Sequence, residues 1–291
     1  MAYLNSLSSS RVLSSLSLSS LVKLSMITIL PSRRMNIKLR LTLSLETSLG
    51  SASNPSGMRR FIDLHLRPRS RGELEAMLGK ALWLGYRGVA VAGDQPPRNL
   101  EAPEGLDVIS RIDLKPNTAG ALKASLRRVR RLYEVVAVEC RSKAVARQAA
   151  RDHRVDVVYF PPDSGLWFDD AEARLAAQSG CAYEINLTEL LSLMRQSDAR
   201  GLRRVAEGIW NAYRRGVPVI LSSGASEPLE MREPRGLASL LTLLDIELED
   251  AVEMISDNPW SIVERNRRKL SGEYAAPGVR VIGQGGGVDA R

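Results

Sequence analysis

The sequence is poor in the two residue types on which zinc and redox sites most often depend. Its 291 residues include two His and two Cys. Cys140 and Cys181 lie far apart and form no CxxC pair, so we interpret both as small core residues of a protein in a reducing, cytoplasmic compartment. A histidine-rich zinc cluster is excluded.

Long apolar runs and nucleotide-binding motifs are also missing. No run of eighteen or more apolar residues occurs, so the sequence predicts no membrane-spanning helix. There is no P-loop, no nucleophile elbow and no HExxH motif. RNA-stacking motifs of the RRM, KH or zinc-knuckle type are absent as well. No short motif therefore assigns the chain to an enzyme class.

Acidic residues are nearly absent from the first part of the chain. Residues 1–57 contain six Lys or Arg, one acid (Glu46), sixteen Ser and thirteen Leu. This composition is typical of an organelle transit peptide. The alternative, which we favour, is a start assigned too early, with Met58 as the true first residue. We expect residues 1–57 to be disordered and the Gly-rich residues 271–291 to form a flexible tail.

From residue 61 onward, apolar strand-like runs alternate with amphipathic helical segments. This alternation predicts an α/β fold with a parallel sheet. The regular spacing, and the lack of GxGxxG after the first strand, favour a TIM-barrel-like domain over an open Rossmann sheet. Since no eighth strand is evident, we expect a distorted or incomplete barrel in a single domain over 58–270. The predicted strands are 61–66, 88–93, 106–114, 135–140, 155–161, 182–187 and 217–224.

Polar residues follow or end these strands, where a parallel barrel places its functional site. The candidate mouth residues are Asp63, His65, Arg111, Asp113, Glu139, Asn186, Ser222 and Ser223. In FIDLH (61–65), Asp63 and His65 point to one face of a strand. We favour a structural hydrogen-bonded pair over a working metal site for these two, and we predict no metal and no catalytic residue.

Basic residues recur at helical spacing on two consecutive predicted helices, 118–133 and 142–153. The aligned cations are Lys123, Arg127, Arg130 and Arg131 on the first helix, and Lys143, Arg147 and Arg151 on the second. One charged face is usually only solvated. Two adjacent Arg-rich faces favour binding to RNA or to an acidic partner.

Several longer stretches, in colinear order over roughly 58–270, resemble archaeal ribonuclease P protein component 3. They are FIDLH, SRIDL, VVAVECRSKAVARQAARDHRVDVVYFP, YEINLTELL, PVILSSGA and SDNPWSIVERN. The resemblance implies a protein subunit of an RNA-based enzyme that removes the 5′ leader from precursor tRNA. It further implies that the RNA subunit and its Mg²⁺ perform the chemistry. The implied partners are the RNase P RNA, precursor tRNA, a small RRM-like protein subunit, often in a heterotetramer, and other RNase P proteins.

That family is in turn similar to metal-dependent phosphoesterases with a polymerase-and-histidinol-phosphatase barrel. Those enzymes begin with His-x-His, where this chain has Asp63 in the first position. In their later Ser-Asp-Ala-His type motif, this chain has Gly224 and Ser226 in place of Asp and His. The resemblance therefore implies a relic of a metal site. The alternative function is a stand-alone phosphoesterase that uses Asp63, His65 and Glu139 around Mg²⁺ or Mn²⁺.

Overall fold

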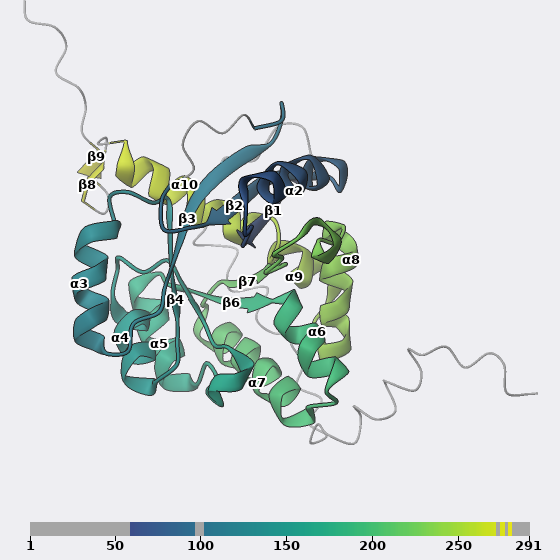
Figure 1. Cartoon of the computed structure of the whole chain (residues 1–291). Coiled ribbons are helices and arrows are strands. Elements are labelled where there is room, and N and C mark those ends of the chain that lie inside the picture. Colours follow the sequence, from purple (N-terminus) through teal and green to yellow (C-terminus); the bar gives the residue numbers. More distant parts are fainter. Residues whose placement is uncertain (1–58, 97–101, 272–273, 277–278, 281–291) are drawn as a thin grey trace, which may run out of the picture. The chain divides into compact units, whose positions relative to one another are not determined.

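The computed structural model describes residues 59–96, 102–271, 274–276 and 279–280. Its centre is a sheet of seven parallel strands arranged in chain order, from β1 to β7 (Figure 1). The prediction of about seven parallel strands is confirmed. The strands are β1 Phe61–Leu66, β2 Tyr86–Ala92, β3 Asp107–Leu114, β4 Val135–Glu139, β5 Val157–Tyr159, β6 Ala182–Asn186 and β7 Val219–Ser222.

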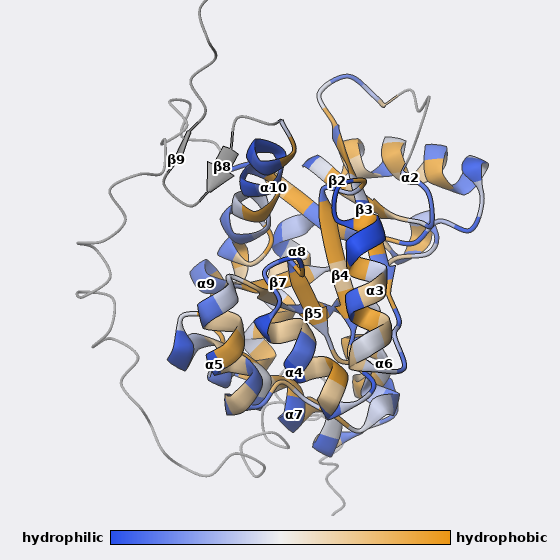
Figure 2. Cartoon of the chain, turned by 90° about the vertical axis from the view of Figure 1, so that its left-hand side faces the viewer, coloured by the Kyte–Doolittle hydropathy of each residue, from blue (hydrophilic) through white to orange (hydrophobic). Residues whose placement is uncertain are grey.

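Helices cover the outside of the sheet and connect most of its strands (Figures 1 and 2); no helix lies between β2 and β3 among the described residues. They are α2 Arg71–Trp83, α3 Ala119–Val129, α4 Lys143–Arg151, α5 Asp170–Ser179, α6 Leu187–Arg195, α7 Ala199–Arg215, α8 Pro234–Ser239, α9 Leu248–Glu253 and α10 Asp257–Leu270. None of these helices is long and apolar enough to cross a membrane. The helix predicted over 118–133 is shorter than expected, because the chain turns after Val129 to bury Tyr133 before β4 begins.

The barrel is nearly closed, but no strand pairs β7 with β1 in the described part of the chain. Instead, the two residues after α9 lie between them. The main-chain N–H of Leu221 on β7 donates to the carbonyl of Met254 at 2.9 Å, and that of Ile62 on β1 donates to Ile255 at 3.0 Å. These bonds satisfy edge groups that an eighth strand would otherwise pair. The predicted incomplete barrel is confirmed.

The inward side chains at the amino end of the barrel form an apolar core that Trp260 of α10 closes. Its indole Nε1 donates to the carbonyl of Arg60 at 2.9 Å, and its ring packs with Ile62. Gly88 on β2 has no side chain because a Cβ there would lie 2.9 Å from the Trp260 ring. The apolar interior therefore occupies one end of the barrel and leaves the carboxyl end of the strands to polar residues.

The two terminal predictions concern residues that lie mostly outside the described ranges. Residues 1–57 are not described, so their predicted disorder stays a prediction. Within the tail predicted over 271–291, two short strands, β8 Tyr274–Ala276 and β9 Val279–Arg280, pair in antiparallel orientation.

Candidate functional site

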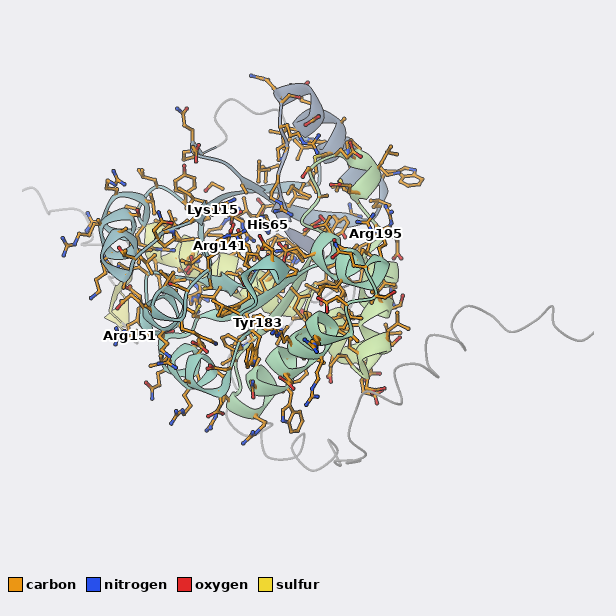
Figure 3. All side chains as sticks on the ribbon, turned by 60° about the horizontal axis from the view of Figure 1, so that its bottom comes forward. His65, Lys115, Arg141, Arg151, Tyr183 and Arg195 are labelled. Carbon is orange, nitrogen blue, oxygen red and sulfur yellow. The ribbon has the colours of Figure 1, made fainter. Side chains whose placement is uncertain are left out.

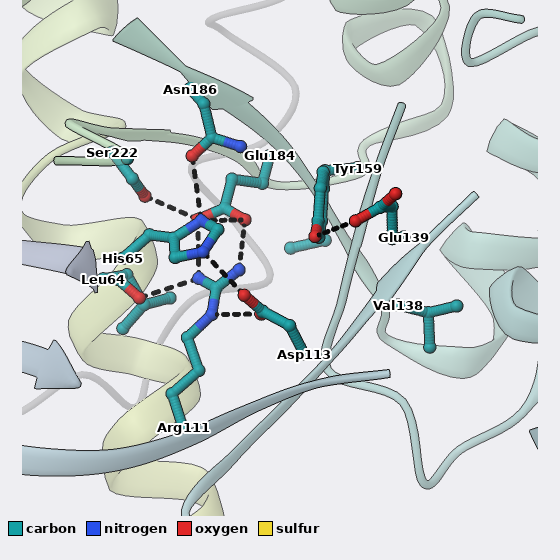
Figure 4. A network of polar contacts seen from close by, with 12 residues as sticks. Leu64, His65, Arg111, Asp113, Val138, Glu139, Tyr159, Glu184, Asn186 and Ser222 are labelled. Carbon is teal, nitrogen blue, oxygen red and sulfur yellow. Dashed lines mark hydrogen bonds and ion pairs between the residues drawn. The ribbon is translucent and has the colours of Figure 1, made fainter. Parts of the chain in front are cut away.

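The carboxyl ends of the strands bring most of the predicted mouth residues into one buried network around Arg111 (Figure 4). The guanidinium of Arg111 is fully buried and donates to both carboxylate oxygens of Glu184, at 2.7 and 2.6 Å. It also donates to Asp113 at 2.8 Å and to the carbonyl of Leu64 at 2.7 Å. Ser222 donates to Glu184 at 2.6 Å. A cation thus sits at the centre of the mouth, held by carboxylates from two strands.

His65 lies between the same two carboxylates. Its Nε2 is 2.7 Å from Asp113 Oδ2, and its Nδ1 is 2.9 Å from Asn186 Oδ1 and 3.5 Å from Glu184 Oε2. Burial and the neighbouring Arg111 cation oppose protonation, but the two carboxylates outweigh them and raise the pKa of His65. In the protonated imidazole both nitrogens donate, and two cations then balance two carboxylates.

The pKa values of the two carboxyl groups, Glu184 and Asp113, shift in the opposite direction to the pKa of His65. Burial alone would raise the pKa of Glu184, but the Arg111 and His65 cations lower it to about 2. The same cations hold the pKa of Asp113 well below its usual range despite its burial. Both groups are therefore ionised in the folded state over the whole neutral range.

These opposed shifts predict a stability optimum in mildly acidic solution. The raised pKa of His65 adds stability that is fully present below about pH 6.5, the unfolded value, and is lost as pH rises through the folded value. Depressed carboxyl pKa values add stability that is present above about pH 4.5 and is lost as pH falls. We expect the thermal unfolding temperature to decline above about pH 6.5. The same pH series on His65→Gln should show a flatter alkaline limb; an identical limb would assign the decline to another group.

The prediction that Asp63 and His65 share a strand face was wrong, and Asp63 belongs to a separate hydrogen-bonded group. The register of β1 is irregular between Asp63 and Leu66, and Asp63 pairs with Val89, on the face opposite Arg111. Its Oδ1 accepts from the main-chain N–H groups of Ser223 at 3.0 Å and His65 at 3.2 Å. Its Oδ2 is buried without a hydrogen-bond partner among the described residues, and burial raises the pKa of this carboxyl group. The predicted contact with His65 is therefore made through the main chain, because the imidazole bonds to other residues.

Glu139 forms a third group at the outer rim of the mouth. Its carboxylate accepts from the hydroxyl of Tyr159 at 2.9 Å and pairs with Lys115 at 3.2 Å and with Arg141. Lys115 and Arg141, both labelled in Figure 3, thus share one carboxylate. Arg141 also pairs with Asp163 at 2.9 Å. These contacts fix Glu139 as an ion-paired rim residue.

The arrangement does not fit a metal site of the kind that the phosphoesterase alternative requires. Asp63, His65 and Glu139 each bond to a different set of partners. Across the described residues, no three or more His, Cys, Asp or Glu side chains are grouped so that they could hold a metal ion. The guanidinium of Arg111 already neutralises the two innermost carboxylates. The mouth is therefore built as a structural ion-pair network.

Sequence reasoning missed Glu184, which is the principal partner of Arg111. The available signal was its spacing: Glu184 lies two residues before Asn186 in AYEIN, so both side chains point to the same strand face. Tyr159 and Lys115 were missed as well.

The cations predicted for RNA binding fall into two groups. Lys123, Arg127 and Arg131 are exposed and make no hydrogen bond or ion pair with any residue that the structure describes. We define these three as the α3 cationic face. Arg128 is exposed on the same helix. This part of the predicted stripe therefore has its charges available to a partner.

The remaining predicted cations have partners within the protein. Arg130 was predicted to lie on the same face as Lys123, Arg127 and Arg131. It instead turns inward and pairs with the buried Asp156. Lys143 is half-buried, and its ammonium donates to Trp167, Asp169 and Glu172 at 2.9 to 3.2 Å.

On α4 the other two predicted cations keep only weak or local contacts. Arg147 lies 3.7 Å from Glu172, and Arg151 bonds to Gln148 at 2.8 Å. The predicted basic stripe on α4 is therefore partly paired within the protein, because α5 and the residue before it supply acids to Lys143 and Arg147. Its binding to RNA stays a prediction.

The fold and the mouth define a TIM-barrel-like protein with internal ion pairs at the mouth of the barrel and with a group of exposed, unpaired cations at α3. Comparison with known families then specifies it further. The chain belongs to the RNase P subunit p30 family, whose model matches residues 60–271.

Curated relatives and a solved structure are similar over most of the chain. Ribonuclease P protein component 3 of Methanosarcina mazei is 27% identical over 234 residues, which cover 78% of this chain and 97% of the relative. The protein of the same name from Methanococcoides burtonii is 23% identical over 232 residues, covering 77% and 95%. A chain in the cryo-EM structure of archaeal ribonuclease P with mature tRNA has a TM-score of 0.65 at 20% identity, covering 77% of this chain and 98% of that one.

Proposed function

We propose that this chain is a protein subunit of ribonuclease P, the enzyme that removes the 5′ leader from precursor tRNA. The observation that carries this proposal is membership in the RNase P subunit p30 family across residues 60–271, which include the whole seven-stranded barrel. The filled mouth supports a non-catalytic role for the chain itself, because its polar groups are engaged with one another. The stand-alone phosphoesterase has no comparable support.

The contribution of this chain would be electrostatic and geometric. The α3 cationic face neutralises RNA phosphates, and the rigid barrel holds those charges in position. The divalent Mg²⁺ would serve the RNA subunit. We propose the RNase P RNA, precursor tRNA and other RNase P proteins as partners in the cytoplasm, including a small RRM-like subunit with which the chain forms a heterotetramer.

Removing the α3 cationic face should weaken binding to the RNase P RNA. In the variant Lys123→Ala/Arg127→Ala/Arg131→Ala, the log–log dependence of affinity on salt should become shallower by about 0.7 to 0.9 for each phosphate that is no longer neutralised. Filter binding across a salt series measures this slope. Precursor-tRNA cleavage by the reconstituted complex should fall when protein is limiting and recover when it is in excess, since the RNA performs the chemistry.

The control removes equal charge elsewhere, in Arg87→Ala/Arg195→Ala/Arg200→Ala, whose side chains are also exposed. Thermal unfolding of both variants should stay close to wild type, because exposed substitutions usually change stability by less than about 0.5 kcal/mol. Equal slopes for the two variants would show a net-charge effect and contradict a specific α3 contact. Loss of a protein partner at unchanged RNA affinity would make α3 a protein interface instead.

A further inference from the structure

The outward face of α2 is apolar and stays exposed in the described part of the chain. The residues that α2 buries against the barrel are Met77, Leu78 and Ala81. On the opposite side of the helix, exposed residues without a polar side chain recur at intervals of four, three and four positions, which is the spacing of a helix-packing seam. They are Gly72, Ala76, Gly79 and Trp83. We call these four residues the α2 seam.

Trp83 is the largest group of the α2 seam. Its side chain is 75% exposed, although tryptophan usually buries most of its large apolar surface. A second apolar side chain lies nearby on η3 (Pro228–Glu230), which packs against α2: Leu229 is 81% exposed. Tryptophan is the residue that most often anchors a protein–protein interface. The exposed indole therefore indicates a contact with another protein surface.

The two glycines of the α2 seam leave room for a second chain. A Cβ added at Gly72 or at Gly79 would meet no described atom within 4 Å, and neither residue has a positive φ. Glycine destabilises the interior of a helix relative to alanine, so no contact among the described residues accounts for these two positions. What glycine does permit is the close approach of another backbone.

The α2 seam is complementary to a second copy of itself. Its positions are symmetric about the middle of the stripe, so an antiparallel pair related by a two-fold axis places Trp83 against the partner's Gly72. The same pairing places Ala76 against the partner's Gly79. The largest residue of the seam therefore meets a position without a side chain.

The charges of α2 agree with this pairing. The helix contains two basic and two acidic residues, so two copies meet without net repulsion. Lys80 makes no ion pair with any described residue, and helical spacing places it on the same flank of the seam as Glu73. Antiparallel packing brings Lys80 of one copy toward the partner's Glu73.

We propose that two copies of this chain associate through the α2 seam as an antiparallel, two-fold symmetric dimer. Trp83 anchors each side of the contact, and the glycines set the close approach of the two helices. One helix offers a small surface, so the dimer is in reversible equilibrium with the monomer. The inference does not depend on the proposed function, because it concerns the chain alone. The α3 cationic face belongs to another helix and stays available to RNA.

Sedimentation velocity of the full chain over a concentration series measures the association. The sedimentation coefficient of wild type should rise with concentration toward that of a dimer. Trp83→Ala should weaken self-association by roughly thirtyfold or more, the loss typical of an interface anchor. Trp210→Ala removes an exposed tryptophan of α7 and is the matched control, which should associate as wild type does. A wild-type chain that stays monomeric throughout, or equal association of Trp83→Ala and wild type, would overturn the inference.

A second variant fills the seam and keeps the anchor. Gly79→Leu adds a side chain where the described part of one chain leaves open space, so the fold should survive, and leucine favours the helix more than glycine does. The same side chain would collide with the partner's Ala76, and the dimer should be lost. A Gly79→Leu protein that unfolds at the wild-type temperature or above and still dimerises would contradict the close approach of the two helices.

Cysteine crosslinking tests the antiparallel orientation. The native Cys140 and Cys181 are fully buried and free, so they should not react. Oxidation of a mixture of Ala76→Cys and Gly79→Cys chains should give a covalent dimer, because these positions face each other. Gly72→Cys alone should give none, since its two copies lie at opposite ends of the seam. A covalent dimer of Gly72→Cys would indicate a parallel pair and overturn the two-fold arrangement.

The competing occupant of the α2 seam is a different protein. Pull-down of the small RRM-like subunit by wild type and by Trp83→Ala separates the two cases. We expect equal capture by both chains, because the seam binds a second copy. Loss of that subunit in Trp83→Ala, with a wild-type chain that is monomeric by sedimentation, would make the seam a heteromeric interface and overturn the inference.

Discussion

Replacement of Arg111 by methionine is expected to lower the free energy of unfolding by about 3 to 5 kcal/mol, which is the usual cost of breaking a buried ion pair by removing one partner. The reason is local. Without the guanidinium, the carboxylates of Glu184 and Asp113 face each other and His65 with one cation missing. Glu184 is fully buried, so it cannot regain solvation in place of the missing partner. Urea denaturation followed by circular dichroism measures the change.

A double variant distinguishes the ion pair from loss of packing. Arg111→Met/Glu184→Leu removes the orphaned carboxylate together with the cation, and buried pairs replaced by apolar groups often recover stability. We expect the double variant to be more stable than Arg111→Met by roughly 2 kcal/mol. If Arg111→Met alone unfolds at the same urea concentration as wild type, the mouth is not the structural network that we describe.

Two features could be predicted from the sequence: the order of the strands, and the position of the polar residues at the carboxyl ends of those strands. Both depend on local periodicity: Arg111 and Asp113 are two residues apart on a regular strand and share a face. The irregularity of β1 between Asp63 and Leu66 breaks this rule for Asp63 and His65. The centre of the network could not be predicted in this way. Arg111 and Glu184 are 73 residues apart, so their contact depends on the registers of β3 to β6 and on the closure of the barrel.

The errors on the helices have the same origin. Helical spacing places Arg130 and Lys143 on outward faces, but it contains no information about which acidic residues the neighbouring elements place nearby. The partner of Arg130 is Asp156, which lies 26 residues further along, and the acids around Lys143 lie 26 and 29 residues further along. The long side chains of Arg130 and Lys143 reach these acids and are therefore largely shielded from solvent. Lys123, Arg127 and Arg131 are exposed as predicted, and no acid among the described residues pairs with them.

Gly224 is the second position at which we expect a large effect. It has a φ of +65°, a left-handed conformation that disfavours side chains. A Cβ at this position would lie 2.7 Å from the Thr188 hydroxyl, 2.9 Å from Arg67 and 3.2 Å from the Cβ of Asn186. Arg67 cannot move away freely, because it donates twice to the carbonyl of Gly224, at 2.7 and 3.1 Å. We therefore expect Gly224→Asp to lower the free energy of unfolding by about 2 to 4 kcal/mol.

The same variant tests whether the mouth can be returned to a metal site. By the resemblance to the phosphoesterases, aspartate is the ligand that would stand at position 224. We expect no stoichiometric zinc or manganese in purified Gly224→Asp, because Arg111 still neutralises Asp113 and Glu184 and no open coordination position is created. Elemental analysis measures the metal, and Gly224→Ala isolates the conformational cost from the effect of the carboxylate. A stable Gly224→Asp protein with one metal per chain, absent again in Gly224→Asp/His65→Ala, would mean that the network gives way to a metal and that the ion pairs do not fix the mouth.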